Sequence, residues 1–394
     1  MSNTSPLSPS SELRILLAVG HLQLTDRQQS ELSALLQENI HWERLFRLGD
    51  VHGMLPLLAY HLSDARLDKA THGMPGKILE AIRAARRINA ARALQLGMEL
   101  DRIGALFAER QIPVMPYKGI MLARRWYGDE TLRQTGDIDL IVAQSDLCAA
   151  RELLTHAGYV PAIEFDSVEQ EQAFVTQTCH YLYTHPAQQV SLELHWDIVR
   201  RHDGVQFDWD AIQERAQSII PWSLPAQEDL LLILAYHGGK HRWSILKWLT
   251  DIAMVSENAA EINWPRVLAS ARSANMSRAM HVSLAASHRL LQVDYPESVL
   301  SAIEEDRAID SLIAAILAAL EKPTQYAWNS AALLNFNLRL RSSWTDKAAY
   351  LWGVVGKPNF QDVREAETFR FSHYFRRLGR LAGKYHLLQR VSRK

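Results

Sequence analysis

Cysteine is scarce in this chain of 394 residues, which contains only Cys148 and Cys179. Two thiols are too few for a disulfide framework or for a cysteine-rich zinc site. The usual zinc-binding spacings are also missing, so a zinc hydrolase ranks last among the functions considered. With so few cysteines, a reduced, cytoplasmic location is the expected one.

Long apolar runs are lacking as well. The nearest, residues 312–320, is short and rich in alanine, which indicates a buried helix and no membrane span. The first residues, MSNTSPLSPSSE, lack the basic start and apolar centre of a signal peptide. They predict a disordered lead over residues 1–11.

The chain also has no excess of charge of one sign, because 43 Lys and Arg balance 44 Asp and Glu. A net charge of −1 gives no general attraction to nucleic acid, which stays an open but less favoured partner. The stretch after Glu367 is basic and is read as a solvated helix face. No G-x-S-x-G, Walker or G-x-G-x-x-G motif supports a hydrolase, a P-loop enzyme or a dinucleotide enzyme.

The pattern of apolar residues predicts three regions after the lead. Residues 12–110 are expected to be helical, and their last stretch is expected to carry one apolar stripe, at positions 78, 82, 85, 88, 91, 94, 98 and 103. Residues 111–206 alternate strand and helix patterns and predict a mixed sheet. Residues 207–394 return to helix. The predicted fold class is α+β, with a small mixed sheet flanked by N-terminal and C-terminal helical regions.

Five strands are predicted in the central region, one of them a short strand over residues 159–165. Residues 111–117 are short and apolar, and residues 137–142 form an apolar run that begins with two acids. Residues 179–185 and 190–196 alternate in polarity around a Pro-containing turn, which predicts an antiparallel hairpin.

Asp137 and Asp139 open the second of these strands. Because side chains alternate along a strand, both carboxylates lie on one face. Two neighbouring carboxylates need a positive partner, and hard oxygen ligands favour Mg²⁺ or Mn²⁺. The alternative is a solvated strand edge, because a D-x-D pair alone is common.

Glu193 lies on a strand that is otherwise suited to burial, on the same face as Ser191 and His195. It is a candidate third metal-side carboxylate or general base. The alternative is a structural ion pair with Arg124 or Arg133. His195 is interpreted as a hydrogen-bonded neighbour of Glu193 rather than a ligand.

Phosphate-holding groups are expected in two places. Lys118-Gly119 joins a strand to a helix, a position where backbone N–H groups meet phosphate, and Arg133 lies just ahead of the acids. Further along the chain, His237, Lys240 and His241 either line a nucleotide cleft or end a helix. Trp243 and Trp248 are interpreted as core residues.

These motifs, in this order, resemble the bacterial uncharacterised nucleotidyltransferase family, which belongs to the DNA polymerase beta-like nucleotidyltransferase superfamily. The resemblance rests on Lys118-Gly119, Arg133, residues 136–140 (GDIDL) and residues 193–196 (ELHW). It extends to Trp42, residues 51–58 and residues 237–251, and so covers roughly residues 42–255. The superfamily usually carries Gly-Ser where this chain has Lys118-Gly119.

The resemblance implies a Mg²⁺-dependent transfer of a nucleoside monophosphate from an NTP, expected to be ATP, to a hydroxyl or phosphate acceptor. Asp137 and Asp139 would bind the metal, with Glu193 as the third carboxylate. The acceptor, whether small molecule, glycan precursor, peptide or protein, is not implied. The alternatives are a catalytically silent member that binds nucleotide or a partner in the same cleft, and a kinase.

Overall fold

The computed structural model describes residues 9–63, 67, 73–199, 203–259, 261–323 and 331–355. The predicted disordered lead therefore falls mostly outside the described residues, as does the basic stretch after Glu367. Among the helices that are described, none combines the length and the apolar character that crossing a bilayer requires.

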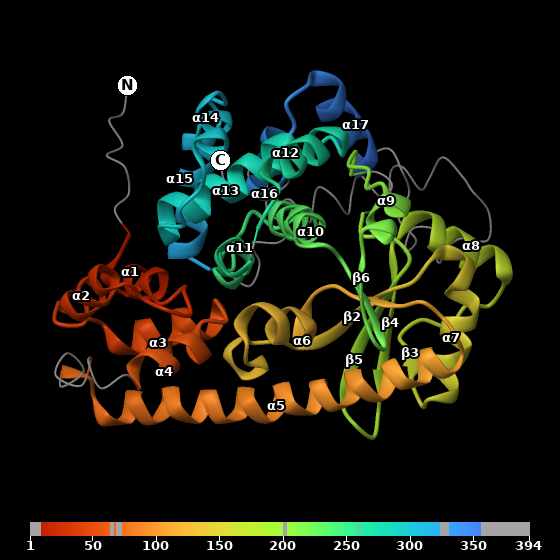
Figure 1. The fold of residues 1–394 in the computed structure, drawn as a ribbon, viewed down its shortest axis with the longest axis horizontal. Coiled ribbons are helices and arrows are strands. Elements are labelled where there is room, and N and C mark those ends of the chain that lie inside the picture. Colours follow the sequence, from red (N-terminus) through yellow and green to blue (C-terminus); the bar gives the residue numbers. More distant parts are fainter. Residues whose placement is uncertain are drawn as a thin grey trace, which may run out of the picture.

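A five-stranded mixed sheet forms the centre of the chain, with strand order β1-β2-β5-β4-β3. Strands β2 and β5 are parallel, while the other neighbouring pairs are antiparallel. The sheet lies at one end of a mostly helical molecule (Figure 1), which confirms the predicted α+β class. The strands are β1 (Met115–Pro116), β2 (Asp137–Ile141), β3 (Val160–Pro161), β4 (His180–His185) and β5 (Val190–His195).

The predicted hairpin is present as β4 and β5, which pair from His180↔His195 to His185↔Val190. The sequence did not predict which strand would take the other edge of β5. That neighbour is β2, in a parallel register that sets Asp139 opposite Glu193. Residues 54 positions apart in the sequence therefore lie side by side.

The N-terminal helices begin where polar side chains cap them. The Ser10 hydroxyl accepts from the backbone N–H of Leu13, and Thr25 and Gln28 form a capping box. Such caps satisfy backbone groups that a helix end leaves unpaired. The helices are α1 (Ser11–Ala18), α2 (Asp26–Leu35), α3 (Trp42–Val51), α4 (Leu55–Leu62) and α5 (Gly76–Glu109).

Helix α5, with 34 residues, runs from the N-terminal helices to the sheet (Figure 1). Its early residue Ile82 packs into a core of helices, whereas Leu96 and Phe107 pack into the core of the sheet region. The single apolar stripe predicted for it is wrong at Ile88 and Met98, which are 71% and 73% exposed. The helix changes partners along its length, so its buried face changes too.

The segments between the strands are short helices and turns. A π-helical turn at Ala123–Tyr127 follows α6 and ends at Gly128, whose φ of 67° is left-handed. Single turns of 3₁₀ helix lie at Glu130–Leu132 and Gln144–Asp146. The helices are α6 (Gly119–Leu122), α7 (Leu147–His156) and α8 (Val168–Gln177).

The C-terminal region is mainly helical, with one departure from the prediction. A hairpin of β6 (Gln217–Ile219) and β7 (Trp222–Leu224) lies against β1, where Ser223 N–H donates to the carbonyl of Val114 at 3.3 Å. The helices are α9 (Trp209–Glu214), α10 (Gln227–Lys240), α11 (Lys247–Asn258), α12 (Trp264–Ser273), α13 (Ser277–Leu291), α14 (Glu297–Glu304), α15 (Ile309–Glu321), α16 (Ala331–Arg339) and α17 (Trp344–Val355).

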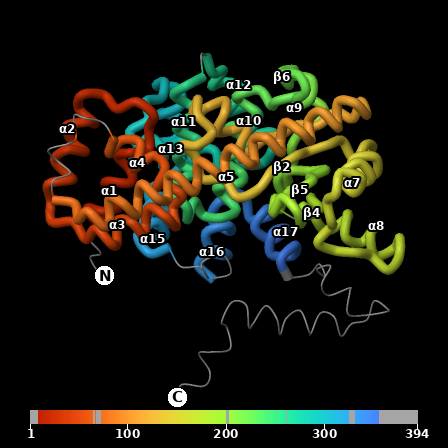
Figure 2. The backbone as a smooth tube through the Cα atoms, turned by 90° about the horizontal axis from the view of Figure 1, so that it is seen from below, coloured from red at the N-terminus to blue at the C-terminus, as the bar shows by residue number. Residues whose placement is uncertain are grey.

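Two apolar cores hold these elements together. The larger core joins N-terminal side chains such as Leu16 and Leu45 to Leu249 and Met280 from the C-terminal helices. The smaller core lies between the sheet, α7 and the second half of α5. Figure 2 shows α1 and α3 beside α13 and α15, while the sheet lies toward the other end of α5. The division at residues 110 and 206 stays a prediction.

Candidate active site

Asp139 and Glu193 form the centre of the candidate site. They are register partners on the parallel strands β2 and β5, so their side chains leave the same face of the sheet. The side chain of Asp139 is 5% exposed, whereas that of Glu193 is 27% exposed. Asp139, Glu193 and His195 each offer a ligand atom, and these three atoms lie within 4.8 Å of one another.

His195 joins the two carboxylates. Its Nε2 lies 3.0 Å from Oε2 of Glu193 and 3.7 Å from Oδ1 of Asp139. The hydroxyl of Tyr117 lies 3.1 Å from the same nitrogen. Burial lowers the pKa of His195, but the neighbouring Asp139, Cys179 and Glu193 outweigh it and raise the pKa to about 10. His195 is therefore a neighbour of Glu193, as the sequence suggested, and the raised pKa favours its protonated form.

Lys118 supplies a second positive charge at this place. Its Nζ lies 2.8 Å from Oδ1 of Asp139, and only 13% of the side chain is exposed. Burial alone would raise the pKa of Asp139, but Lys118 and His195 hold that pKa well below its usual range. Asp139 is therefore ionised in the folded protein at neutral pH.

Asp137 lies on the same face of β2 but is not one of the three converging ligand residues. Burial raises its pKa to about 6, and the nearby charge of Asp139 adds to this effect. Glu193 differs: burial raises its pKa, but the hydrogen bond from His195 and the charges of His180 and His195 together outweigh burial, so the pKa lies below its ordinary value. The acids are thus close enough to repel one another, which is the situation a divalent cation relieves.

The donor set fits a hard divalent cation. Oδ1 of Asp139 is buried and accepts no hydrogen bond of good geometry, although the ammonium of Lys118 is near. Carboxylate oxygens are the ligands that Mg²⁺ and Mn²⁺ prefer. Asp139 and Glu193 would hold the ion, with Asp137 beside them.

The turn at Lys118-Gly119 lies directly against these acids. Gly119 has a φ of 59°, in the left-handed region, and a Cβ there would lie 3.1 Å from the carbonyl oxygen of Asp137. Only glycine fits this position without strain. The close approach of the turn to β2 explains why Lys118 reaches Asp139, and phosphate contact by this turn stays a prediction.

Arg133, which was expected to contact phosphate, is hydrogen-bonded within the protein. Its Nε and Nη2 donate to the two carboxylate oxygens of Asp251 at 2.7 and 2.8 Å, and Nη1 donates to Thr135 at 3.0 Å. The Tyr127 hydroxyl also donates to Asp251. All three nitrogens of Arg133 are engaged within the protein. This arrangement favours a structural role, tying α11 to the segment before β2, over phosphate contact.

Arg124 is paired as well, with Asp101 and Glu130. The contacts described for Glu193 are to His195 and, at 4.0 Å, to His180. The alternative reading of Glu193 as the partner of one of these two arginines therefore does not match the structure.

His237 and His241 lie at the C-terminal end of α10 and pack on Trp248. The ring centroids of His237 and His241 lie 5.2 and 5.3 Å from that of Trp248. Burial lowers the pKa of His237 well below its usual value, and the positive charges of Lys118 and Lys240 add to this. This end of α10 therefore faces the Lys118 side of the site, although contact with a nucleotide stays a prediction.

Lys247 is a basic residue that the sequence reasoning missed. It begins α11, and its Nζ donates to the carbonyl of Gln134 at 3.1 Å. Burial and the charge of Arg133 lower its pKa to about 8, against the opposite effects of Asp251 and Asp137. Lys247 lies inside residues 237–251, which belong to the family resemblance, and this was a weak indication of a role in the site. Sequence alone does not show that the start of α11 lies near the acids.

Cys179 and His180 also lie beside the site, and the sequence did not indicate them as site residues. They lie where β4 begins, and His180 pairs across the sheet with His195. Burial raises the pKa of the Cys179 thiol, but the neighbouring imidazoles of His180 and His195 outweigh it and bring the pKa to about 6. Two cysteines gave no zinc spacing in the sequence, and only the folded hairpin brings this thiol to two imidazoles.

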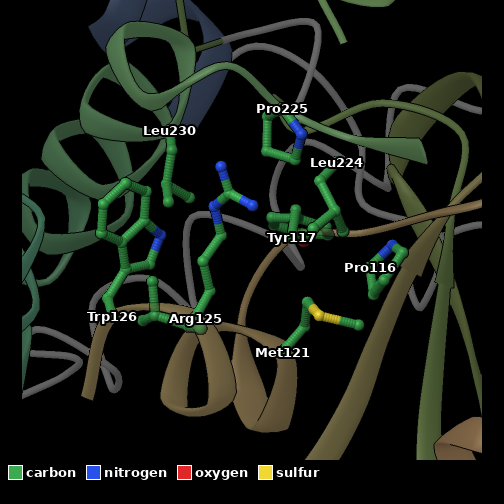
Figure 3. A pocket seen from close by; sticks show the side chains of 9 residues that line it. Pro116, Tyr117, Met121, Arg125, Trp126, Leu224, Pro225 and Leu230 are labelled. Carbon is green, nitrogen blue, oxygen red and sulfur yellow. The ribbon is translucent and has the colours of Figure 1, made fainter. Parts of the chain in front are cut away.

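A small depression lies next to the site, between α6, β7 and the start of α10 (Figure 3). Its walls are mostly apolar, and the Arg125 side chain lies among them with the indole of Trp126. Tyr117 connects the two places, because it lines the depression while its hydroxyl reaches His195. The other lining residues are Pro116, Met121, Leu122, Leu224, Pro225 and Leu230.

A small mixed sheet between helical regions, with carboxylates on adjacent parallel strands, is the architecture of a nucleotidyltransferase. The family model described as "Uncharacterised nucleotidyltransferase" matches residues 38–292, and the chain belongs to this family. Neither the curated proteins nor the solved structures gave a match.

Proposed function

We propose that the protein is a Mg²⁺-dependent enzyme that transfers a nucleoside monophosphate from an NTP, with ATP the expected donor, to a hydroxyl or phosphate acceptor in the cytoplasm. The family supports nucleotidyl transfer in general. The observation that carries the metal-dependent mechanism is the convergence of Asp139 and Glu193, which are register partners on one face of the sheet and have ligand atoms within 4.8 Å of each other.

In the reaction, the acceptor oxygen forms a bond to the α-phosphorus while the bond from that phosphorus to the bridging oxygen breaks. Pyrophosphate leaves. A bound Mg²⁺ ion would neutralise the charge that develops on the phosphate oxygens. The protein contributes mainly position and charge, so no covalent intermediate is required.

Glu193 would act on the acceptor. It is ionised and partly exposed, and His195 fixes one of its oxygens at 3.0 Å. The carboxylate would orient the acceptor hydroxyl and take its proton as the new bond forms.

Lys118 and Lys247 are the cations that would hold the triphosphate. In the structure Lys118 neutralises Asp139, and a cation bound by the acids would release its ammonium to the phosphates. Lys247 is tied by one hydrogen bond to the Gln134 carbonyl, which leaves other N–H donors of its ammonium for phosphate.

The test is to incubate the pure protein with Mg²⁺, a cell extract and NTPs labelled at either the α or the γ phosphate. The proposal expects α label on an acceptor and labelled pyrophosphate from the γ-labelled NTP. Transfer of γ label alone would make the protein a kinase and overturn the proposal. The matched control is the Asp137→Asn, Asp139→Asn double variant.

A catalytically silent nucleotide-binding member is the second candidate. The observation that favours it is the Lys118–Asp139 ion pair of 2.8 Å, because the acid already has a counter-charge without a metal. This candidate expects nucleotide binding by calorimetry with no transfer of either label.

A further inference from the structure

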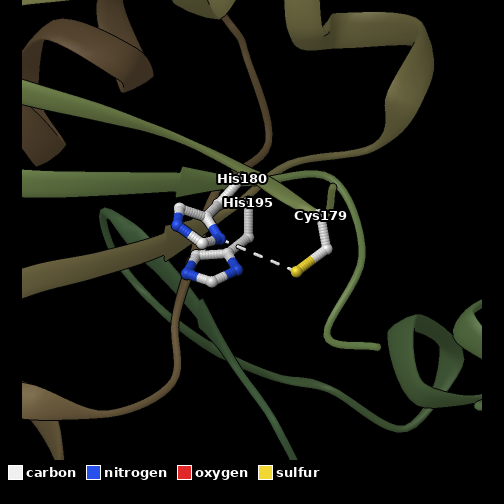
Figure 4. Close-up of side chains that lie close together, drawn as sticks. All are labelled: Cys179, His180 and His195. Atoms are coloured by element: carbon white, nitrogen blue, oxygen red, sulfur yellow. Dashed lines mark hydrogen bonds between the residues drawn. The ribbon is translucent and has the colours of Figure 1, made fainter. Parts of the chain in front are cut away.

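We propose that Cys179, His180 and His195 form a transition-metal site for Zn²⁺, separate from the carboxylate site and joined to it through His195. One ligand atom from each of these residues lies within 4.8 Å of the others. The three side chains converge at the end of the β4–β5 hairpin (Figure 4).

The hairpin register brings the ligands together. His180 and His195 are a cross-strand pair, and the Trp196 N–H donates to the carbonyl of Cys179 at 3.1 Å, which extends the pairing by one residue. The two imidazole centroids are therefore 4.8 Å apart. Neighbouring strands hold all three side chains, so little backbone movement is needed to close them around an ion.

The separation between Cys179 and His180 is that of two ligands on a tetrahedral zinc ion. With Zn–S near 2.3 Å and Zn–N near 2.05 Å, sulfur and nitrogen on one ion lie about 3.6 Å apart. Sγ of Cys179 lies 3.6 Å from Nδ1 of His180. One thiolate with two imidazoles is a soft-to-borderline set that favours zinc over magnesium.

The unused nitrogen of His195 gives independent support. Its Nε2 faces Tyr117 and Glu193, whereas its Nδ1 is buried and has no hydrogen-bond partner. Figure 4 shows a nitrogen of each imidazole on the side of the Cys179 sulfur. A buried polar atom without a partner is costly, and a metal ligand bond would satisfy it.

The two sites take different metals because their donors differ. Nδ1 of His195 would bind the zinc, and Nε2–H would then donate to Glu193, which fixes the ring for the carboxylate site. The side chain of His180 is 28% exposed, so the ion has a path from solvent, and a water completes the fourth position. His195 is thus a positioning residue for Glu193.

Titration of the reduced, metal-free full-length protein with Co²⁺ tests the site, since a bound thiolate gives a strong sulfur-to-cobalt absorption band. We expect a band that saturates at one ion per chain and that Zn²⁺ displaces. Cys179→Ser should abolish the band, and His180→Ala should weaken Co²⁺ binding at least tenfold. Cys148→Ser, at an exposed cysteine, should leave the band intact.

Protection from alkylation tests the same site without any substitution. Zn²⁺ should slow modification of Cys179 in the native protein but not that of Cys148, as peptide mass spectrometry would record. A wild-type protein with no thiolate band and no protection overturns the proposal, and so does a band that survives in Cys179→Ser. The Asp137→Asn, Asp139→Asn variant should keep the band, so this outcome does not depend on nucleotidyl transfer.

Discussion

Asp139 and Glu193 stand opposite each other on the parallel strands β2 and β5, although α7, β3, α8 and β4 separate them in the chain. Their shared face carries Lys118 on one side and His195 on the other. Every group at the proposed centre is therefore fixed by the sheet or by the turn that precedes α6, and each can be changed singly.

Replacing Asp137 and Asp139 with asparagine should abolish Mg²⁺-dependent transfer, with a loss of at least about 100-fold because the negative charges that bind the cation are gone. The thermal midpoint should stay near that of the wild type. Asp50→Asn, at an exposed position, is the matched control and should be fully active. Full activity in the double variant would exclude this assignment of the metal ligands.

Glu193→Gln should lower the rate of transfer by about 10²–10⁴-fold, the range typical of a lost general base. Nucleotide affinity should change little, since the base acts on the acceptor. Single-turnover kinetics and equilibrium nucleotide binding would separate the two effects. Glu164→Gln, an exposed glutamate, is the control. An affinity loss as large as the rate loss would show that Glu193 acts through the metal or the nucleotide and not as the base.

Lys247→Met should weaken NTP binding by about 10- to 100-fold, the effect of one charge-assisted hydrogen bond. NMP binding should suffer less, because the lost contact is to the outer phosphates. Lys77→Met removes an exposed lysine at the far end of α5 and should have no effect. Equal losses for NTP and NMP would contradict a role in holding the triphosphate.

Asp251→Asn should lower the free energy of unfolding by about 3–5 kcal/mol, because it leaves Arg133 charged and buried without its carboxylate partner. Removing both charges with Arg133→Met and Asp251→Leu should recover part of this stability. Asp310→Asn removes the partner of Arg289 at the surface and should barely alter denaturant unfolding. A small effect of Asp251→Asn would show that the pair is not needed for folding.

Glu99 should make stability depend on pH in acid. Burial raises its pKa, but hydrogen bonds from Arg102 and Tyr159 outweigh it, so the folded-state pKa is lowered. The ionised group therefore stabilises the fold above its ordinary pKa near 4.5, and this is lost as pH falls through the lower folded-state value. Glu99→Gln should be less stable at pH 7, and the difference should shrink toward pH 3. A difference that is constant with pH would contradict the argument.

The sequence predicted where the strands lie better than it predicted which strands pair with each other. Alternating polarity located β4 and β5 and put Glu193 and His195 on one face, because side-chain period is a local property. The parallel pairing of β5 with β2 depends on distant packing, so only the structure shows that Glu193 lies opposite Asp139. The strand pattern suggested Glu193 as a third carboxylate beside Asp137 and Asp139, and the family resemblance implied the same role.

The basic residues were harder to assign, because a positive side chain near acids in sequence can find another partner in space. Arg133 was expected to meet phosphate, and it instead forms two hydrogen bonds with Asp251 from α11. Lys247 was overlooked, and from the start of the same helix it lies near enough to Asp137 for their charges to interact. Both outcomes follow from the position of α11, which no local pattern specifies.

Helix α5 affects how the protein unfolds, because it packs into both apolar cores. It is about 50 Å long and contributes Ile82 to one core and Leu96 to the other. Loss of either core would leave half of this helix without its packing, and an unsupported helix of that length is marginal in water. The helical region and the sheet are therefore expected to unfold as one cooperative unit. A destabilising substitution in the helical core should then also lower the stability of the sheet that carries the carboxylates.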